Sequence, residues 1–307
     1  MISVKHISKQ FGVCEALKNI SFEIPSGEIV GFLGQNGAGK TTLMRILTAY
    51  LPPSSGEAFI CGENILSHPV GIRRKIGYLP ENPPLYSTMT VKNYLRFAAR
   101  LKDVSVKYEK AQVDHVLSEC HLLEVKDHLI ATLSKGYKQR VGIAQAIIHE
   151  PEVIILDEPT NGLDPVQIQH VRQLIRRLES KRTVIISTHI LSEIEQLAQR
   201  VLILKKGEIV ADNAIEQIVV SDEKKQLFVT VKGKEEMIEQ AVKEANDVKQ
   251  INIKFLEDDL FEVHLENTNN VSHYNQMIQS FLKYQVKIVS MREKKNSLEE
   301  AFLKIHK

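Results

Sequence analysis

Short apolar runs in the first two hundred residues have the pattern of buried strands. Residues 29–33, 153–156 and 184–186 are almost uninterrupted aliphatic stretches, which is typical of strands covered on both faces. Helical apolar spacing follows in residues 42–47 and 141–148. Strands that alternate with helices in this way predict an α/β protein built on a largely parallel sheet.

The chain is expected to divide at a polar linker, residues 221–225. Residues 1–217 form the larger predicted domain, which contains a mostly helical subdomain at about 90–150. The predicted second domain, 226–307, has the order β-α-β-β-α-β, which is typical of a small α+β ferredoxin-like domain. Its expected elements are 227–232, 235–245, 248–255, 260–265, 271–282 and 286–291, followed by a final short helix at 297–305.

The stretch GQNGAGKTT fits the phosphate-binding pattern G-x-x-x-x-G-K-[ST] and lies between a strand-like run and a helix-like run. Its glycines let backbone N–H groups turn toward phosphate oxygens, and the helix N-terminus adds partial positive charge. Lys40 is expected to reach the β- and γ-phosphates of ATP, and the Thr41 hydroxyl to ligate Mg²⁺. The candidate ATP-binding residues here are Gly34, Gln35, Asn36, Gly37, Ala38, Gly39, Lys40, Thr41 and Thr42. This pattern predicts a P-loop NTPase.

Two acids follow the apolar run at 153–156. Asp157 would lie at the carboxyl end of its strand, where open α/β sheets bind ligands, and is a candidate Mg²⁺ ligand. Glu158 points in another direction and is the candidate general base for the attacking water.

The segment Leu-Ser-Lys-Gly-Tyr at 133–137 resembles the Leu-Ser-Gly-Gly-Gln signature of ATP-binding cassette (ABC) ATPases. Ser134 and Gly136 match that signature, whereas Lys135 and Tyr137 depart from it. The resemblance implies that Ser134, Lys135 and Gly136 contact ATP held by another subunit, and therefore a head-to-tail dimer with two sandwiched ATP molecules. Lys135 either strengthens the phosphate contact or points to solvent.

The order of the remaining motifs extends this resemblance over about residues 1–215. Asp164 matches the aspartate of the family's loop after the catalytic glutamate, and His189 matches its switch histidine, which contacts the γ-phosphate and orders the attacking water. Phe11 stands where the family has an adenine-stacking aromatic, and it either stacks on adenine or packs in the core.

Glu81 replaces the glutamine of the family loop that links the nucleotide to the membrane partner. A carboxylate can ligate Mg²⁺ or accept a hydrogen bond from water, but it cannot donate one. This replacement, with the C-terminal domain, resembles bacterial exporter-type ATPases of the drug-efflux and gliding-motility kind. The C-terminal domain is either a dimerisation or regulatory module or a passive appendage.

The composition of the chain limits the kinds of binding partner that the sequence predicts. The 307 residues include 40 basic and 38 acidic side chains, so nothing predicts a nucleic-acid-binding surface. The three cysteines are widely spaced and have the pattern of reduced thiols. No apolar stretch reaches the length of a membrane span, so a transport path would lie in a separate membrane-spanning permease subunit. These features predict a cytoplasmic protein, peripheral on the inner face of the membrane, that uses ATP and Mg²⁺.

Three function classes remain. The favoured one is the ATP-hydrolysing subunit of an ABC transporter, working as a homodimer or a heterodimer and driving export through its permease. The second is a soluble ABC ATPase that acts on a macromolecular complex, although the double cassettes and long coiled-coil insertions of such relatives are missing from this sequence. The third is a low-turnover ATP-dependent regulatory module, which Glu158 and His189 argue against.

Overall fold

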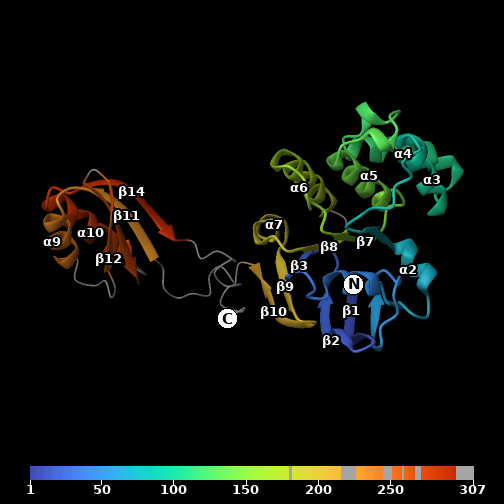
Figure 1. The fold of residues 1–307 in the computed structure, drawn as a ribbon, viewed down its shortest axis with the longest axis horizontal. Coiled ribbons are helices and arrows are strands. Elements are labelled where there is room, and N and C mark those ends of the chain that lie inside the picture. Colours follow the sequence, from blue (N-terminus) through green and yellow to red (C-terminus); the bar gives the residue numbers. More distant parts are fainter. Residues whose placement is uncertain (180–181, 216–225, 245–250, 258, 267–270, 295–307) are drawn as a thin grey trace. The chain divides into compact units, whose positions relative to one another are not determined.

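The computed structural model describes residues 1–179, 182–215, 226–244, 251–257, 259–266 and 271–294 (Figure 1). The chain divides into two compact units, Met1–Ile215 and Glu216–Lys307. Each unit has its own hydrophobic core, so the two are described separately.

A six-stranded sheet forms the centre of the first unit, in the order β10-β9-β3-β8-β7-β6. Its strands are β3 (Ile29–Leu33), β6 (Ile76–Leu79), β7 (Val153–Asp157), β8 (Thr183–Thr188), β9 (Arg200–Lys205) and β10 (Glu208–Ala214). All pairs in this sheet are parallel except β9 with β10. Every residue of β3, β7 and β8 is buried, which explains why these strands are apolar without alternation.

A four-stranded antiparallel sheet, in the order β2-β1-β4-β5, covers one side of the central sheet. Its strands are β1 (Ile2–Phe11), β2 (Cys14–Ile24), β4 (Ser55–Ile60) and β5 (Glu63–Asn64). Apolar side chains of this sheet, of α1 (Lys40–Leu47) and of one face of the central sheet form a single core. The mixed-sheet α/β architecture that the sequence predicts is therefore confirmed.

Helices α3 (Val91–Leu101), α4 (Val106–Glu119) and α5 (Lys135–Ile147) gather at the other end of this unit (Figure 1). Side-chain caps begin two of them, since Thr90 Oγ1 accepts from the N–H of Asn93 at 3.3 Å and Ser134 Oγ accepts from that of Tyr137 at 3.4 Å. The other helices are α2 (Pro69–Lys75), α6 (Pro165–Glu179) and α7 (Leu191–Leu197).

The parallel strands bring four loops to one edge of the central sheet. The phosphate loop follows β3, Glu81 follows β6, Glu158 follows β7, and His189 follows β8. Because the carboxyl ends of parallel strands lie on the same side, residues as distant in sequence as Glu81 and His189 meet there.

The second unit has the predicted β-α-β-β-α-β order, with sheet order β12-β13-β11-β14, and α9 and α10 cover one face of that sheet (Figure 1). Its elements are β11 (Gln226–Lys232), α9 (Glu235–Glu244), β12 (Ile251–Glu257), β13 (Leu260–Glu266), α10 (Val271–Lys283) and β14 (Lys287–Lys294). The small α+β domain predicted from the sequence is confirmed. The linker at 221–225 and the helix expected at 297–305 lie outside the described residues.

In the part of the chain that the structure describes, no helix is both long and apolar enough to cross a bilayer. Cys14, Cys61 and Cys120 are free thiols. Leu85 packs against the core around α3 and α5, whereas Tyr86 is 52% exposed and contacts the Phe97 ring edge-on.

Candidate active site

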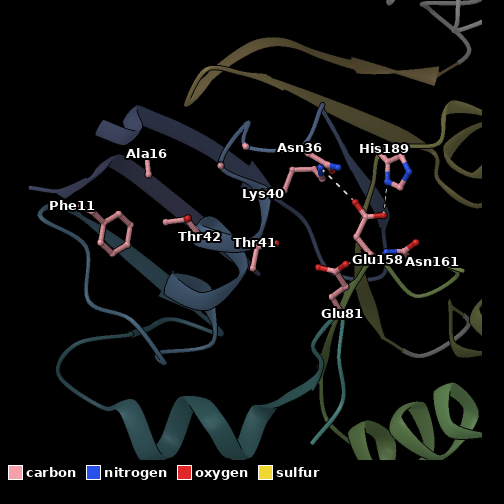
Figure 2. Close-up of a pocket in the computed structure, with 12 residues that line it drawn as sticks. Phe11, Ala16, Asn36, Lys40, Thr41, Thr42, Glu81, Glu158, Asn161 and His189 are labelled. Atoms are coloured by element: carbon pink, nitrogen blue, oxygen red, sulfur yellow. Dashed lines mark hydrogen bonds and ion pairs between the residues drawn. The ribbon is translucent and has the colours of Figure 1, made fainter. Parts of the chain in front are cut away.

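A cavity of about 620 Å³ opens where these loops meet. Phe11 and Ala16 lie at one end of it, and Glu158 and His189 lie at the other (Figure 2). The full lining consists of Phe11, Ala16, Asn36, Gly37, Gly39, Lys40, Thr41, Thr42, Glu81, Glu158, Asn161 and His189. One end therefore offers an aromatic face for a base, and the other offers charged groups for phosphates.

The phosphate loop turns through glycines in the left-handed region. Gly37 has φ +81° and Gly39 has φ +107°, and a Cβ at residue 39 would lie 2.7 Å from the carbonyl oxygen of Ala16. Only glycine fits this close approach. No side chain caps the N-terminus of α1, so its first N–H groups are available to an anion.

Lys40 lines the cavity. Its Nζ donates to the carbonyl oxygen of Gly34 at 2.7 Å and lies 3.5 Å from Glu158 Oε1. Both side chains are more than nine-tenths buried, so their attraction is less screened than at a surface. The ammonium group thus lies where the phosphate loop and the acidic strand end converge.

Glu158 also contacts the switch-like histidine. Glu158 Oε2 lies 2.9 Å from His189 Nδ1, within hydrogen-bonding distance when that nitrogen carries the proton (Figure 2). The backbone N–H of Glu158 donates to the carbonyl oxygen of Ser187 at 3.0 Å, and the residue has φ +49°. The two acids have different side-chain partners, since Asp157 contacts Ser187 whereas Glu158 contacts Lys40 and His189.

Asp157 contacts the neighbouring strand β8 through Ser187. Its Oδ1 accepts a hydrogen bond from the Ser187 hydroxyl, while Oδ2 is buried without a partner. Burial raises the pKa of Asp157, and the nearby Glu81 carboxylate raises that pKa further, whereas Thr41 and Lys40 act in the opposite direction. A buried carboxylate oxygen without a partner, beside a threonine hydroxyl and a second carboxylate, has the donor chemistry that suits Mg²⁺.

Asn161 is a site residue that the sequence analysis did not identify. It follows Glu158 in the loop toward α6, and its Nδ2 donates to Glu81 Oε1 at 3.0 Å. Ala16 and Ser187 were also missed. Ser187 lies two residues before His189, whereas Ala16 lies beside none of the recognised motifs.

The three signature residues do not line this cavity. Gly136 lies against α6, where an added Cβ would come within 2.6 Å of Gln167 Cδ. The Lys135 ammonium lies over Gly162 of the same chain, in the space that a side chain at that position would occupy. Lys135 is nevertheless an exposed residue, and it does not line the cavity of its own chain.

Other predicted residues have supporting roles in the described structure. Asp164 lies outside the cavity and accepts from the N–H of Gln167 at 2.9 Å at the start of α6. Gln35 closes the turn of the phosphate loop by accepting from the N–H of Ala38 at 3.1 Å. Gly34 supplies its carbonyl oxygen to Lys40.

Comparison with known proteins shows the family to which the chain belongs. Residues 17–161 match the ABC transporter family. The chain is 33% identical over 305 residues to an uncharacterized ABC transporter ATP-binding protein, YxlF of Bacillus subtilis, and the match covers 99% of both chains. It is 40% identical over 214 residues to the bacitracin transport ATP-binding protein BcrA of Bacillus licheniformis, covering 69% of each.

A solved structure shows the same fold. The dimeric post-hydrolysis ATP-binding cassette MJ0796, bound to ADP and phosphate, is 28% identical to this chain. It superposes with a TM-score of 0.64 over 70% of this chain and 98% of its own. The protein therefore belongs to the ATP-binding proteins of ABC transporters, which bind and hydrolyse ATP.

Proposed function

We propose that ATP lies along the cavity from Phe11 to Glu158, and that Glu158 directs the attacking water at the γ-phosphate. The observation that carries this proposal is the position of the Glu158 carboxylate, 3.5 Å from Lys40 Nζ and 2.9 Å from His189 Nδ1. A carboxylate between a phosphate-binding ammonium and an imidazole can accept a proton from water. His189 steadies that water and the γ-phosphate.

The other residues act by position and charge. Lys40 and the N–H groups of the loop and α1 hold the β- and γ-phosphates. Thr41, Asp157 and Glu81 would hold Mg²⁺, which neutralises the developing phosphate charge when bound. Three carboxylates (Glu81, Asp157 and Glu158) in one region also favour a cation beside them.

Ser134, Lys135 and Gly136 would serve the ATP of a second subunit. Ser134 and Lys135 are exposed at the N-terminus of α5, where an anion is favoured. A head-to-tail pair, of two copies or of this chain with a related one, would bring that terminus to the partner's γ-phosphate.

A second cavity, of about 390 Å³, is the proposed docking place of the membrane-spanning subunit. Its lining is Arg45, Thr48, Tyr50, Arg73, Ile76, Tyr78, Pro80, Asn82, Pro84, Lys102 and Gln145. Pro80 and Asn82 flank Glu81, which lines the first cavity. The loop at 80–84 therefore forms part of the wall of both cavities. A displacement of this loop at the nucleotide cavity would also change the shape of the second cavity.

The charge of this second cavity suits an acidic partner segment. Arg45, Arg73 and Lys102 supply three cations, and none of the described residues that line it carries a carboxylate. Burial, and then the neighbouring Arg73, lower the pKa of Lys102. A carboxylate from the membrane subunit would relieve this repulsion.

Export is the proposed direction, supported by the resemblance of Glu81 and of the C-terminal unit to exporter-type ATPases. The C-terminal unit is proposed to act in dimerisation or regulation. Together these assignments describe a protein peripheral on the cytoplasmic face of the membrane.

Capture from detergent-solubilised membranes tests the transport assignment. Glu158→Gln with ATP is expected to co-purify with a stoichiometric membrane-spanning protein. Arg73→Glu, added to the Glu158→Gln variant, should reduce the amount of co-purified membrane protein about tenfold, because it places a negative charge in the docking cavity. Arg74→Glu is the matched control, since Arg74 pairs with Asp103 on the surface and does not line the cavity. Recovery of ribosomal or DNA-repair components without a membrane protein would contradict transport.

Phe11→Ala tests the position of the base. Because the ring is 48% exposed at the cavity end, its loss should weaken ATP binding about threefold to tenfold and leave turnover at saturating ATP unchanged. Val13→Ala is the control, since Val13 is fully exposed in the same hairpin outside the cavity. Equal ATP affinities of the two variants, measured by titration, would show that Phe11 does not contact the base.

A further inference from the structure

We infer that Asn161 is a positioning residue for ATP hydrolysis, which holds Glu81 at the nucleotide cavity through its side-chain amide. The hydrogen bond from Asn161 Nδ2 to Glu81 Oε1, 3.0 Å long, joins the loop after the catalytic carboxylate to the loop after β6. The inference deepens the proposed function, because it rests on this cavity being the ATP site.

The direction of this hydrogen bond is fixed by chemistry. An ionised carboxylate has acceptors only, so Glu81 can bond a neighbour only if that neighbour donates. The Asn161 amide supplies a donor without adding charge. A glutamine at position 81 could be either donor or acceptor, so the dependence on a donor at 161 is specific to the glutamate in this chain.

Glu81 needs such a partner because of its electrostatic surroundings. Glu81 and Glu158 both line the cavity, and Asp157 ends β7, the strand next to β6 in the sheet. Mutual repulsion among these acids favours the outward swing of Glu81, which lies on an exposed loop. The bond from Asn161 opposes that swing.

The loop that carries Asn161 is firmly anchored. The Thr160 hydroxyl donates to Glu193, a carboxylate that is 1% exposed, and the Thr188 hydroxyl donates to the same carboxylate at 2.9 Å. Thr188 immediately precedes His189. The Asn161 amide is therefore held in a fixed relation to the strand end that carries His189.

Glu81, the acceptor of this hydrogen bond, lies on a more exposed loop. Glu81 and Asn82 are exposed, and the loop at 80–84 lines both cavities. Asn161 thus connects the anchored catalytic side to the segment that faces the second cavity. Loss of this connection should slow hydrolysis more than it weakens nucleotide binding.

Two substitutions, Asn161→Asp and Glu81→Gln, made singly and together in the full-length protein, test the inference. Asn161→Asp sets two carboxylates against each other and should reduce kcat about tenfold or more, with the KM for ATP within about threefold of wild type. In a Glu81→Gln background the same substitution should cost less than about twofold, because the introduced glutamine amide can then donate to the introduced carboxylate. Steady-state phosphate release measures all four proteins.

Asn93→Asp is the matched control, because it makes the same chemical change in the first turn of α3, on an exposed residue. Its kcat should equal that of wild type. If Asn161→Asp lowered kcat by the same factor in the wild-type and Glu81→Gln backgrounds, the inference would be overturned. ATP hydrolysis by the double variant would show that its fold is intact. Failure of the proposed function would appear differently, as a wild-type protein without ATP hydrolysis.

Discussion

Glu158→Gln should bind ATP with nearly normal affinity and hydrolyse it about a hundredfold or more slowly. The amide keeps the size of the side chain but cannot accept a proton from water at neutral pH, and general base catalysis contributes about 10²- to 10⁴-fold. The variant also removes the negative charge 3.5 Å from Lys40 Nζ, which leaves that ammonium free for phosphate. ATP affinity by titration and phosphate release in single turnover measure the two effects separately.

The same variant should accumulate as an ATP-bound dimer. When phosphate is not released, the closed pair has no route to reopen, so size-exclusion chromatography with ATP should show a dimer. Glu57→Gln is the control, because Glu57 is an exposed carboxylate on β4 outside the cavity. Hydrolysis by Glu158→Gln within about threefold of the control would mean that another group activates the water.

The part of the site that is proposed to bind phosphate could be located from the sequence because its chemistry is local. Gly37, Gly39 and Lys40 lie within four consecutive residues, so their spacing alone gathers N–H groups and an ammonium around one anion. Asp157 and Glu158 were also predictable, since a buried strand delivers whatever follows it to the ligand-binding edge. The different roles predicted for these acids are matched by different partners, Ser187 for Asp157 and His189 for Glu158.

Contacts between loops could not be predicted in this way. Asn161 and Glu81 are 80 residues apart, and their bond depends on β6 and β7 being neighbours in the sheet. The packing of Lys135 over Gly162 likewise depends on how α5 lies against the loop after Glu158. The amino-acid sequence alone does not indicate such contacts, because each partner taken by itself is an ordinary polar or small residue.

In the C-terminal unit, hydrophobic periodicity was sufficient to predict the order of the strands and helices. Alternating strand and helix signals gave its element order, and the ferredoxin-like arrangement then agrees with the observed sheet order β12-β13-β11-β14. The described part of strand β12 begins at Ile251. The predicted start at residue 248 falls within residues 245–250, which lie outside the described residues.

Lys40→Ala should lose both ATP binding and turnover, which distinguishes it from Glu158→Gln. Lys40 is 5% exposed, and its ammonium group donates to the carbonyl oxygen of Gly34 at 2.7 Å, so the position of that group is fixed before phosphate arrives. Hydrogen bonds to charged groups contribute about 1.5–3 kcal/mol, which corresponds to a loss of affinity of roughly 10- to 150-fold. Titration with ATP and phosphate release at saturating ATP measure the two losses.

The control for this substitution is Lys18→Ala, because Lys18 pairs with Glu208 on the surface and does not line the cavity. We expect its ATP affinity and turnover to match those of wild type. Lys40→Ala leaves Glu158 buried without its cation, so circular dichroism and thermal unfolding should accompany the assay to show that the domain is folded. A folded Lys40→Ala protein that still hydrolyses ATP at the wild-type rate would disprove the assignment of this cavity, because the phosphates would then lie elsewhere.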